Sequence, residues 1–219
     1  LASITTDVWV KLGDDENGGD DSSVTGDEDN PFATIEWAIK MIDPASNPNG
    51  KTVINIGAGT FSPTTTQENF PVLMFSNIDL LGRGEANTTL DAQGTDKVIV
   101  FEYSTNNTVS ELTLQGVCSG DPCGDTYTDA NGNGIYDEGE VWDDLNGNGF
   151  FDEASDFRYY QGGGVFVHSS NPSFQNMTIS GNAAISGGGM YFQSANSKLI
   201  NVNIEYNDAN DAGGIRAVG

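Results

Sequence analysis

Short runs of alternating apolar and polar residues, broken by Gly, Asn and Ser, fill most of the chain. The stretch "GGGVFVHSSNPSFQNMTISGN" (162–182) is typical, and turn residues in such stretches recur every 6 to 10 positions. Side chains alternate between the two faces of a strand, so each run predicts a short strand with one apolar face. The spacing leaves room for strands and turns and has no helical period.

These runs belong to internal repeats. Residues 162–182 realign on 187–207 with a shift of 25 and no gap, and a further copy opens at Gly213. The same shift carries 53–59 onto 78–84. The equivalent residues are Val165, Met190 and Ile215; Ile179 and Ile204; Asn176 and Asn201; Asn182 and Asn207; Gly57 and Gly82; and Gly59 and Gly84. A fixed period of this length is typical of a solenoid.

Stacking explains why such short strands can be stable. A strand cannot bury its apolar face alone, whereas stacked coils bury a continuous column of side chains. A coil of about 25 residues, with three short strands and three turns, is the unit of a right-handed parallel β-helix. Neighbouring coils lie about 4.8 Å apart, so Asn side chains in one column can bond to each other. The sequence therefore predicts an all-β fold, a right-handed parallel β-helix.

An acidic insertion interrupts this solenoid. Residues 100–116 align on 165–181 with a shift of 65, which is one coil of 25 and an insertion of 40 between about Val117 and Phe157. The segment holds eleven of the 32 Asp and Glu residues. It is therefore expected to be a loop that leaves the solenoid.

The N-terminal region has a different pattern. Residues 7–13 predict a strand, and "NPFATIEWAIKMI" (30–42) predicts an amphipathic helix with Asn30 as its cap and Pro31 at its first position. The apolar stripe of this helix consists of Phe32, Ile35, Ile39 and Ile42. A solenoid needs its open end covered, and we expect the helix to cover it.

Four segments follow from these patterns. Residues 1–50 form an N-terminal strand and capping helix, and 51–117 form the first β-helix coils. Residues 118–157 are the inserted module, and 158–219 are the regular repeats. The solenoid is expected to continue, or to stack on another subunit, beyond residue 219.

The insertion contains a full match to a calcium loop of the EF type. Such a loop places oxygen ligands at positions 1, 3, 5, 7, 9 and 12, with Gly at position 6. Starting at Asp129, the ligands are Asp129, Asn131, Asn133, Ile135 by its carbonyl, Asp137 and Glu140, and Gly134 is at position 6.

A second loop follows closely. Its ligands are Asp144, Asn146, Asn148, Phe150 by its carbonyl, and Asp152. Position 12 is Ser155 rather than Glu, so the bidentate ligand is either missing or supplied by Glu153 or Asp156. The two loops are too close for the helices of a true EF-hand, and they resemble the helix-poor calcium loops of secreted bacterial proteins. Two calcium ions are therefore predicted, the alternative being a flexible Gly- and Asn-rich loop that binds nothing.

The charge and the cysteine content limit the possible binding partners of the protein and its possible cellular location. The formal charge is −24, and the eight Lys and Arg residues are too few to attract nucleic acid or anionic membranes. The chain lacks the run of roughly eighteen apolar residues that membrane insertion requires. Cys118 and Cys123, in "CSGDPC", suit a small disulfide loop, which predicts an extracellular or cell-surface location.

The repeats also carry a resemblance to known families. "NPFATIEWAI" followed by "TVINIGAGTFSP" resembles the capping helix and first coil of bacterial pectin-lyase-like β-helix families. "GGGV…ISGN…GGGM" is similar to the Gly-rich repeats of surface proteins of the polymorphic outer-membrane adhesin type. The resemblance implies a β-helix but little about function, because this architecture carries lyases, hydrolases, adhesins and structural proteins.

The coils themselves contain few reactive groups. His168 is the only histidine, with Tyr103 and Gln193 as its expected column neighbours. No basic residue of the coils shares a column with an acidic cluster, as a lyase would need, and Asp208 and Asp211 are the nearest approach to a hydrolase pair. Phe101, Phe166 and Tyr191 share a column that could stack on sugar rings, unless the insertion covers them.

Two classes of function remain. The first is a non-enzymatic, calcium-stabilised extracellular β-helix, structural or adhesive. Its expected partners are further copies of itself, bound end to end or laterally, or a cell-surface glycan. The alternative is a β-helix protein that binds or cleaves a polysaccharide, by a lyase or hydrolase reaction. The lack of a reactive cluster favours the non-enzymatic class.

Overall fold

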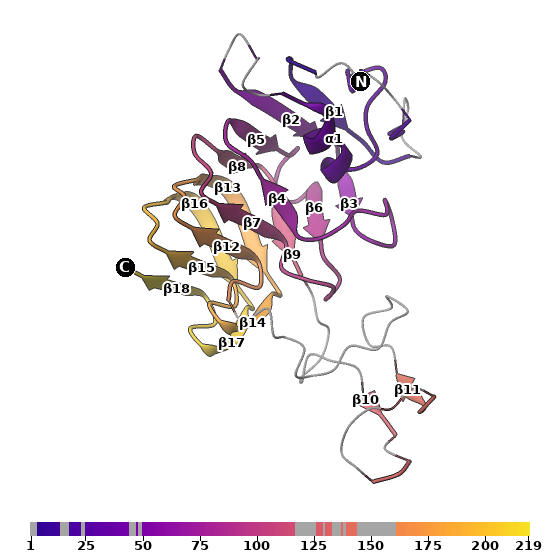
Figure 1. The fold of residues 1–219 in the computed structure, drawn as a ribbon, viewed down its shortest axis with the longest axis vertical. Helices are drawn as coiled ribbons and strands as arrows, with labels where there is room; N and C mark the ends of the chain where they lie inside the picture. Colours follow the sequence, from indigo (N-terminus) through magenta and orange to yellow (C-terminus); the bar gives the residue numbers. More distant parts are fainter. Residues whose placement is uncertain are drawn as a thin grey trace.

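The computed structural model describes residues 4–13, 18–22, 25–43, 47, 50–116, 126–128, 130–132, 137, 139–143 and 161–219. Apart from one short helix, the regular structure in this part of the chain is β (Figure 1). Strand β1 (Val8–Val10) and helix α1 (Ile35–Met41) precede a stack of parallel strands. The predicted parallel β-helix is therefore confirmed.

The stacked strands group into five turns, each with three strands. The first two turns are β2 (Thr52–Ile56), β3 (Gly59–Phe61) and β4 (Val72–Met74), then β5 (Ile78–Leu81), β6 (Thr88–Asp91) and β7 (Ile99–Glu102). The third is β8 (Thr108–Ser110), β9 (Thr113–Gln115) and β12 (Val165–His168). The last two are β13 (Ser173–Ser180), β14 (Ala183–Ser186) and β15 (Met190–Gln193), then β16 (Lys198–Glu205), β17 (Asp208–Asp211) and β18 (Ile215–Val218).

These strands form three parallel sheets. The nine-stranded sheet has the order β1-β2-β5-β8-β13-β9-β6-β3, with β16 also beside β13. The five-stranded sheet has the order β18-β15-β12-β7-β4, and β14 pairs with β17. A separate antiparallel pair, β10 (Thr126–Tyr127) and β11 (Trp142–Asp143), lies in the insertion, outside this stack (Figure 1).

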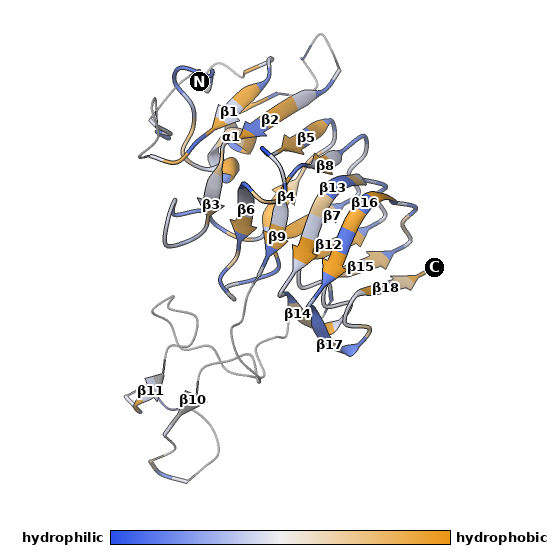
Figure 2. Ribbon diagram, turned by 180° about the vertical axis from the view of Figure 1, so that it is seen from behind, coloured by the Kyte–Doolittle hydropathy of each residue, from blue (hydrophilic) through white to orange (hydrophobic). Residues whose placement is uncertain are grey.

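Strand alternation fills the core. Alternate residues are buried in β2 and β5, and their apolar side chains form one cluster with those of the later turns. Apolar residues accordingly concentrate on the strands in Figure 2. Phe101 and Phe174 meet edge to face in this core, with ring centroids 5.8 Å apart.

The predicted period holds in the later turns. Val165 pairs with Met190, which pairs with Ile215. Asn201 Nδ2 donates to Asn176 Oδ1 at 3.1 Å, and Asn182 Nδ2 donates to Asn207 Oδ1 at 2.9 Å, so stacked amides bond between turns. Asn176 and Asn201 have positive φ, a conformation that Asn tolerates better than most residues.

The first turns depart from this period. Val53 pairs with Asp79 and Gly59 pairs with Thr88, so the predicted pairings of Gly57 with Gly82 and of Gly59 with Gly84 are wrong. The reason is burial: Thr52, Ile54 and Ile56 face the core, and they must stack on Ile78 and Leu80. A slip of one residue would turn every side chain of the strand to the opposite face.

Helix α1 begins later than predicted. Its N-cap is Thr34, whose Oγ1 accepts a hydrogen bond from Trp37 N at 3.2 Å. Asn30 is not a cap, because its N–H donates to Asp27 Oδ1 at 2.9 Å in the preceding turn. The prediction of a helix from residue 30 is therefore wrong, although Phe32, Ile35 and Ile42 of the expected stripe are buried.

A buried carboxylate anchors the start of the helix. Glu68, only 1% exposed, accepts hydrogen bonds from Ile35 N at 2.7 Å and from Glu36 N at 2.9 Å. Burial raises the pKa of Glu68 to about 7, although the two N–H groups oppose the shift. The negative charges of Asp21 and Glu36 also raise this pKa.

Candidate functional site

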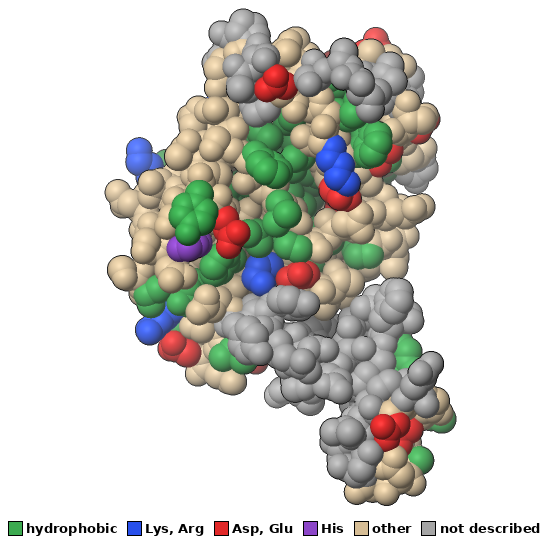
Figure 3. Space-filling model, viewed as in Figure 1, with side chains coloured by type: hydrophobic (Ala, Val, Ile, Leu, Met, Phe, Trp, Pro, Cys, Tyr) green, Lys and Arg blue, Asp and Glu red, His purple; other side chains and the backbone are tan. Residues whose placement is uncertain are grey.

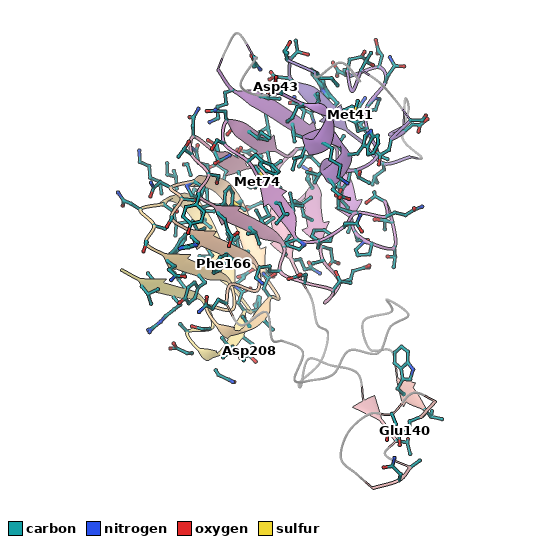
Figure 4. All side chains as sticks on the ribbon, in the orientation of Figure 1. Met41, Asp43, Met74, Glu140, Phe166 and Asp208 are labelled. Carbon is teal, nitrogen blue, oxygen red and sulfur yellow. The ribbon has the colours of Figure 1, made fainter. Side chains whose placement is uncertain are left out.

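The outward face of the five-stranded sheet carries one column of mainly apolar side chains. Consecutive partners in this column are Leu73, Val100, Phe166, Tyr191 and Arg216. We call this series the outer column. Figure 4 shows Phe166 on the middle strand of this sheet.

Phe101 does not belong to the outer column, and the prediction that it shares a column with Phe166 and Tyr191 is wrong. It pairs with Val167, is fully buried, and points into the core. The difference in residue number between paired residues is one larger for β7 and β12 than for β8 and β13. Ile99 pairs with Val165, whereas Thr108 pairs with Ser173. In the same register, Glu102 pairs with His168 and lies on the outside.

Phe166 and Tyr191 do lie together in the outer column. Their rings are stacked, with centroids 5.9 Å apart and planes inclined by 14°. Tyr191 is only 6% exposed and Phe166 is half-buried, so little of this pair is accessible to a ligand.

The accessible apolar surface lies instead over β4 and β7. Leu73 is 54% exposed, Phe75 is 59% exposed and Tyr103 is 71% exposed. These three residues help to line a groove of about 230 Å³ that also contains Glu102. Figure 3 shows hydrophobic side chains gathered on this face, interspersed with acidic and basic groups.

His168 contributes to the same face. Its column neighbours are Glu102 and Gln193, so the prediction of Tyr103 in this column was wrong by one residue. Tyr103 still contacts the imidazole, edge to face, with centroids 5.0 Å apart. No group of three or more His, Cys, Asp and Glu side chains suited to a metal occurs among the described residues.

Several basic side chains of the coils are each paired with a carboxylate. Lys51 Nζ lies 2.8 Å from Asp79 Oδ1, and Lys97 Nζ lies 3.5 Å from Asp96 Oδ1. Burial lowers the pKa of Lys97, whereas Asp96 and Glu102 raise it. Arg216 Nε is 3.3 Å from Asp211 Oδ2. Lys51 and Arg216 are each paired with one carboxylate, whereas Lys97 lies close to both Asp96 and Glu102.

The first predicted calcium loop is closed at its base by β10 and β11. Thr128 N donates to Val141 O at 2.8 Å beside this antiparallel pair. Inside the loop, Asn131 Nδ2 donates to Asp137 Oδ2 at 2.6 Å. The carboxylate of Glu140 accepts hydrogen bonds from Ala130 N at 2.8 Å and from Asp137 N at 3.1 Å. Glu140 is labelled in Figure 4.

Three predicted ligands of this loop, Asn131, Asp137 and Glu140, are therefore close together. The remaining predicted ligands of both loops, and both cysteines, lie outside the described residues: Asp129, Asn133, Ile135, Asp144, Asn146, Asn148, Phe150, Asp152, Asp156, Cys118 and Cys123. Two calcium ions and the disulfide stay predictions.

Comparison with known proteins identifies the family. A model described as "Protein of unknown function (DUF1565)" matches residues 17–219. The chain belongs to the DUF1565 family. No curated protein and no solved structure matches the chain. In the described residues of this DUF1565 chain, no helix is long and apolar enough to cross a membrane.

Proposed function

We propose that this protein is a non-enzymatic, calcium-stabilised β-helix of the extracellular space or cell surface, with a structural or adhesive role. The observation that carries the proposal is the approach of Asn131, Asp137 and Glu140 within the first loop. These residues occupy positions 3, 9 and 12 of the twelve-residue pattern that begins at Asp129.

The loop is suited to calcium rather than magnesium. Calcium takes six to eight oxygen ligands in flexible geometry, whereas Mg²⁺ requires a near-ideal octahedron and retains several of its waters. The loop combines carboxylates, side-chain amides and one backbone carbonyl, as calcium prefers. Bound calcium would also offset the repulsion between the many carboxylates of the insertion.

An extracellular role fits these properties. Extracellular calcium modules bind with dissociation constants of about 10⁻⁴ to 10⁻³ M, which only millimolar calcium outside the cell saturates. The charge of −24 is likewise suited to a surface that binds divalent cations. Association with further copies of the chain stays a prediction, which analytical ultracentrifugation in calcium would test.

Calorimetric titration with calcium, and thermal melts before and after chelation, test the proposal. We expect two binding events and a melting temperature that falls on chelation. Magnesium at the same concentration should bind more weakly. The absence of binding at millimolar calcium would overturn the proposal, and it would leave the acidity without a role in metal binding.

Carbohydrate binding is a second candidate, favoured by the aromatic groups of the outer face. Tyr103 is exposed beside His168 and Glu102, so a sugar ring could stack on the phenol while the polar groups bond to its hydroxyls. Oligosaccharide titration of Tyr103→Ala would test this function. Tyr206→Ala is the matched control, because Tyr206 is also exposed but lies in the last turn.

A further inference from the structure

Strand β4 ends the five-stranded sheet and has one open edge. It pairs with β7 on one side, and the sheet has no further strand beyond it among the described residues. Val72 N donates to Val98 O at 2.9 Å, toward β7. Backbone groups of consecutive residues point to opposite sides of a strand, so the N–H and C=O of Leu73 point toward the open edge.

An apolar groove runs beside this edge. It has a volume of about 370 Å³ and lies between α1, which contributes Ile39, and the segment Phe70–Phe75. We call it the edge groove. The hydrogen bond from Asn69 Nδ2 to Glu36 Oε2, at 2.6 Å, links the helix to the strand segment within its lining.

The edge groove is continuous with the groove of the outer face. Leu73 and Phe75 line both of them, so apolar surface extends from Ile39 to Tyr103 over the first two turns. More than half of each side chain is exposed at Leu73 and Phe75, although both are large and apolar. Contiguous exposed apolar surface of this kind marks an interaction site.

We infer that the edge groove binds an extended peptide segment of a partner protein, which adds to β4 as a further strand. The backbone of the segment would bond to the N–H and C=O of Leu73, and alternate side chains would enter the groove. Glu36 in the edge groove is already paired with Lys40, but Glu102 lines the adjoining groove and the protein carries a charge of −24. The segment should therefore combine apolar residues with Lys or Arg.

A peptide fits this groove better than a sugar does. The edge groove is lined mainly by apolar side chains, including Phe70, Pro71 and Leu73, which offer a sugar few hydrogen-bonding partners. An extended peptide instead satisfies its own backbone on the open strand edge. The inference goes beyond the calcium proposal and does not depend on it, since the edge groove belongs to the solenoid.

Selection from a random nonapeptide library on the immobilised, calcium-saturated protein tests the inference. We expect enriched peptides with alternating apolar and basic residues. Binding of a synthetic copy should weaken at least tenfold in Leu73→Glu and in the milder Leu73→Ser, but not in Leu199→Glu. Leu199 is a matched control because it is also an exposed leucine, in β16 of the last turn.

Amide hydrogen exchange provides the second measurement. The bound peptide should slow exchange at Leu73 in the wild-type protein, since this N–H would enter the new ladder. The inference is overturned if the library gives no enriched peptide, if Leu73→Ser binds the peptide as well as the wild type does, or if protection appears away from β4. Protection of Leu73 by a neutral oligosaccharide, without any peptide binding, would also overturn it.

Discussion

The carboxylate of Glu68 accepts a hydrogen bond from the backbone N–H of Ile35 at 2.7 Å, and this bond joins a loop of the first turn to the start of the capping helix. Because Glu68 is buried, its proton is bound more tightly in the folded protein than in the unfolded chain, which raises the pKa from 4.5 to about 7. A folded state that binds more protons loses stability as the pH rises.

The first prediction concerns this pH dependence. The contribution of Glu68 to stability should be fully present below pH 4.5 and should fall as the pH rises to about 7. A shift of this size corresponds to roughly 3 kcal/mol. Thermal melts of the wild type and of Glu68→Gln at several pH values should therefore show that the wild type becomes less stable relative to the variant as the pH rises. Glu205→Gln, which removes a carboxylate at an exposed site, is the control.

The second prediction concerns the first predicted calcium loop. Glu140 occupies position 12, where a carboxylate binds calcium through both oxygens. Glu140→Gln should therefore weaken one of two calcium sites at least tenfold and leave the other unchanged in a calorimetric titration. Asp208→Asn changes the charge equally but alters an exposed strand of the solenoid. Equal effects of the two substitutions would point to general charge repulsion instead of a site.

The third prediction concerns the stacked amides. Asn182 is buried and its Nδ2 donates to Ser180 O at 3.0 Å and to Asn207 Oδ1 at 2.9 Å. Asn182→Ala removes these bonds and leaves the acceptors inside the turn, so the free energy of unfolding should fall by about 1–3 kcal/mol. Denaturant unfolding measures this loss. Asn203→Ala, at an exposed position of β16, should change stability by less than about 0.5 kcal/mol.

The fourth prediction tests the register of β7. If Phe101 points into the core, Phe101→Ala should lower the free energy of unfolding by about 3–5 kcal/mol. Phe75→Ala should have a much smaller effect, because Phe75 is mostly exposed. Similar losses for the two variants in denaturant unfolding would mean that Phe101 lies on the outer face.

The later turns could be predicted from the sequence because their strands and turns keep one length. Every pairing between β13 and β16 follows the repeat, and so does the stacking of Asn176 on Asn201. In the first three turns the turn segments vary in length. The predicted register of β7 was wrong by one residue, so Phe101 was expected on the outside although it lies in the core. Strand alternation could have revealed this error, because a register with Phe101 on the outside turns its neighbour Glu102 toward the core.

The anchor of the helix had no comparable signal. Glu68 is 33 residues from Ile35, and nothing local distinguishes it from the other acidic residues of the chain. The true N-cap, Thr34, was a recognisable cap residue, but Asn30 and Pro31 gave a stronger local pattern. The edge groove was also missed, because it depends on how α1 lies against β4.

The unit from Gly162 to Ser186 stacks on the next turn with a constant shift of 25 residues, so we expect it to act as an interchangeable module. Each of its stacking partners in the next turn lies 25 positions later, as in the pair formed by Asn182 and Asn207. Duplicating or excising that whole unit would therefore join matching surfaces, and the solenoid would lengthen or shorten by one layer. Removing one residue fewer than the whole unit would shift the register of the strands beyond the junction, and their inward-facing side chains would then face outward. Among the regular later turns, growth by gene duplication should therefore proceed in whole units of 25 residues, whereas the first turns accommodate other lengths in their loops.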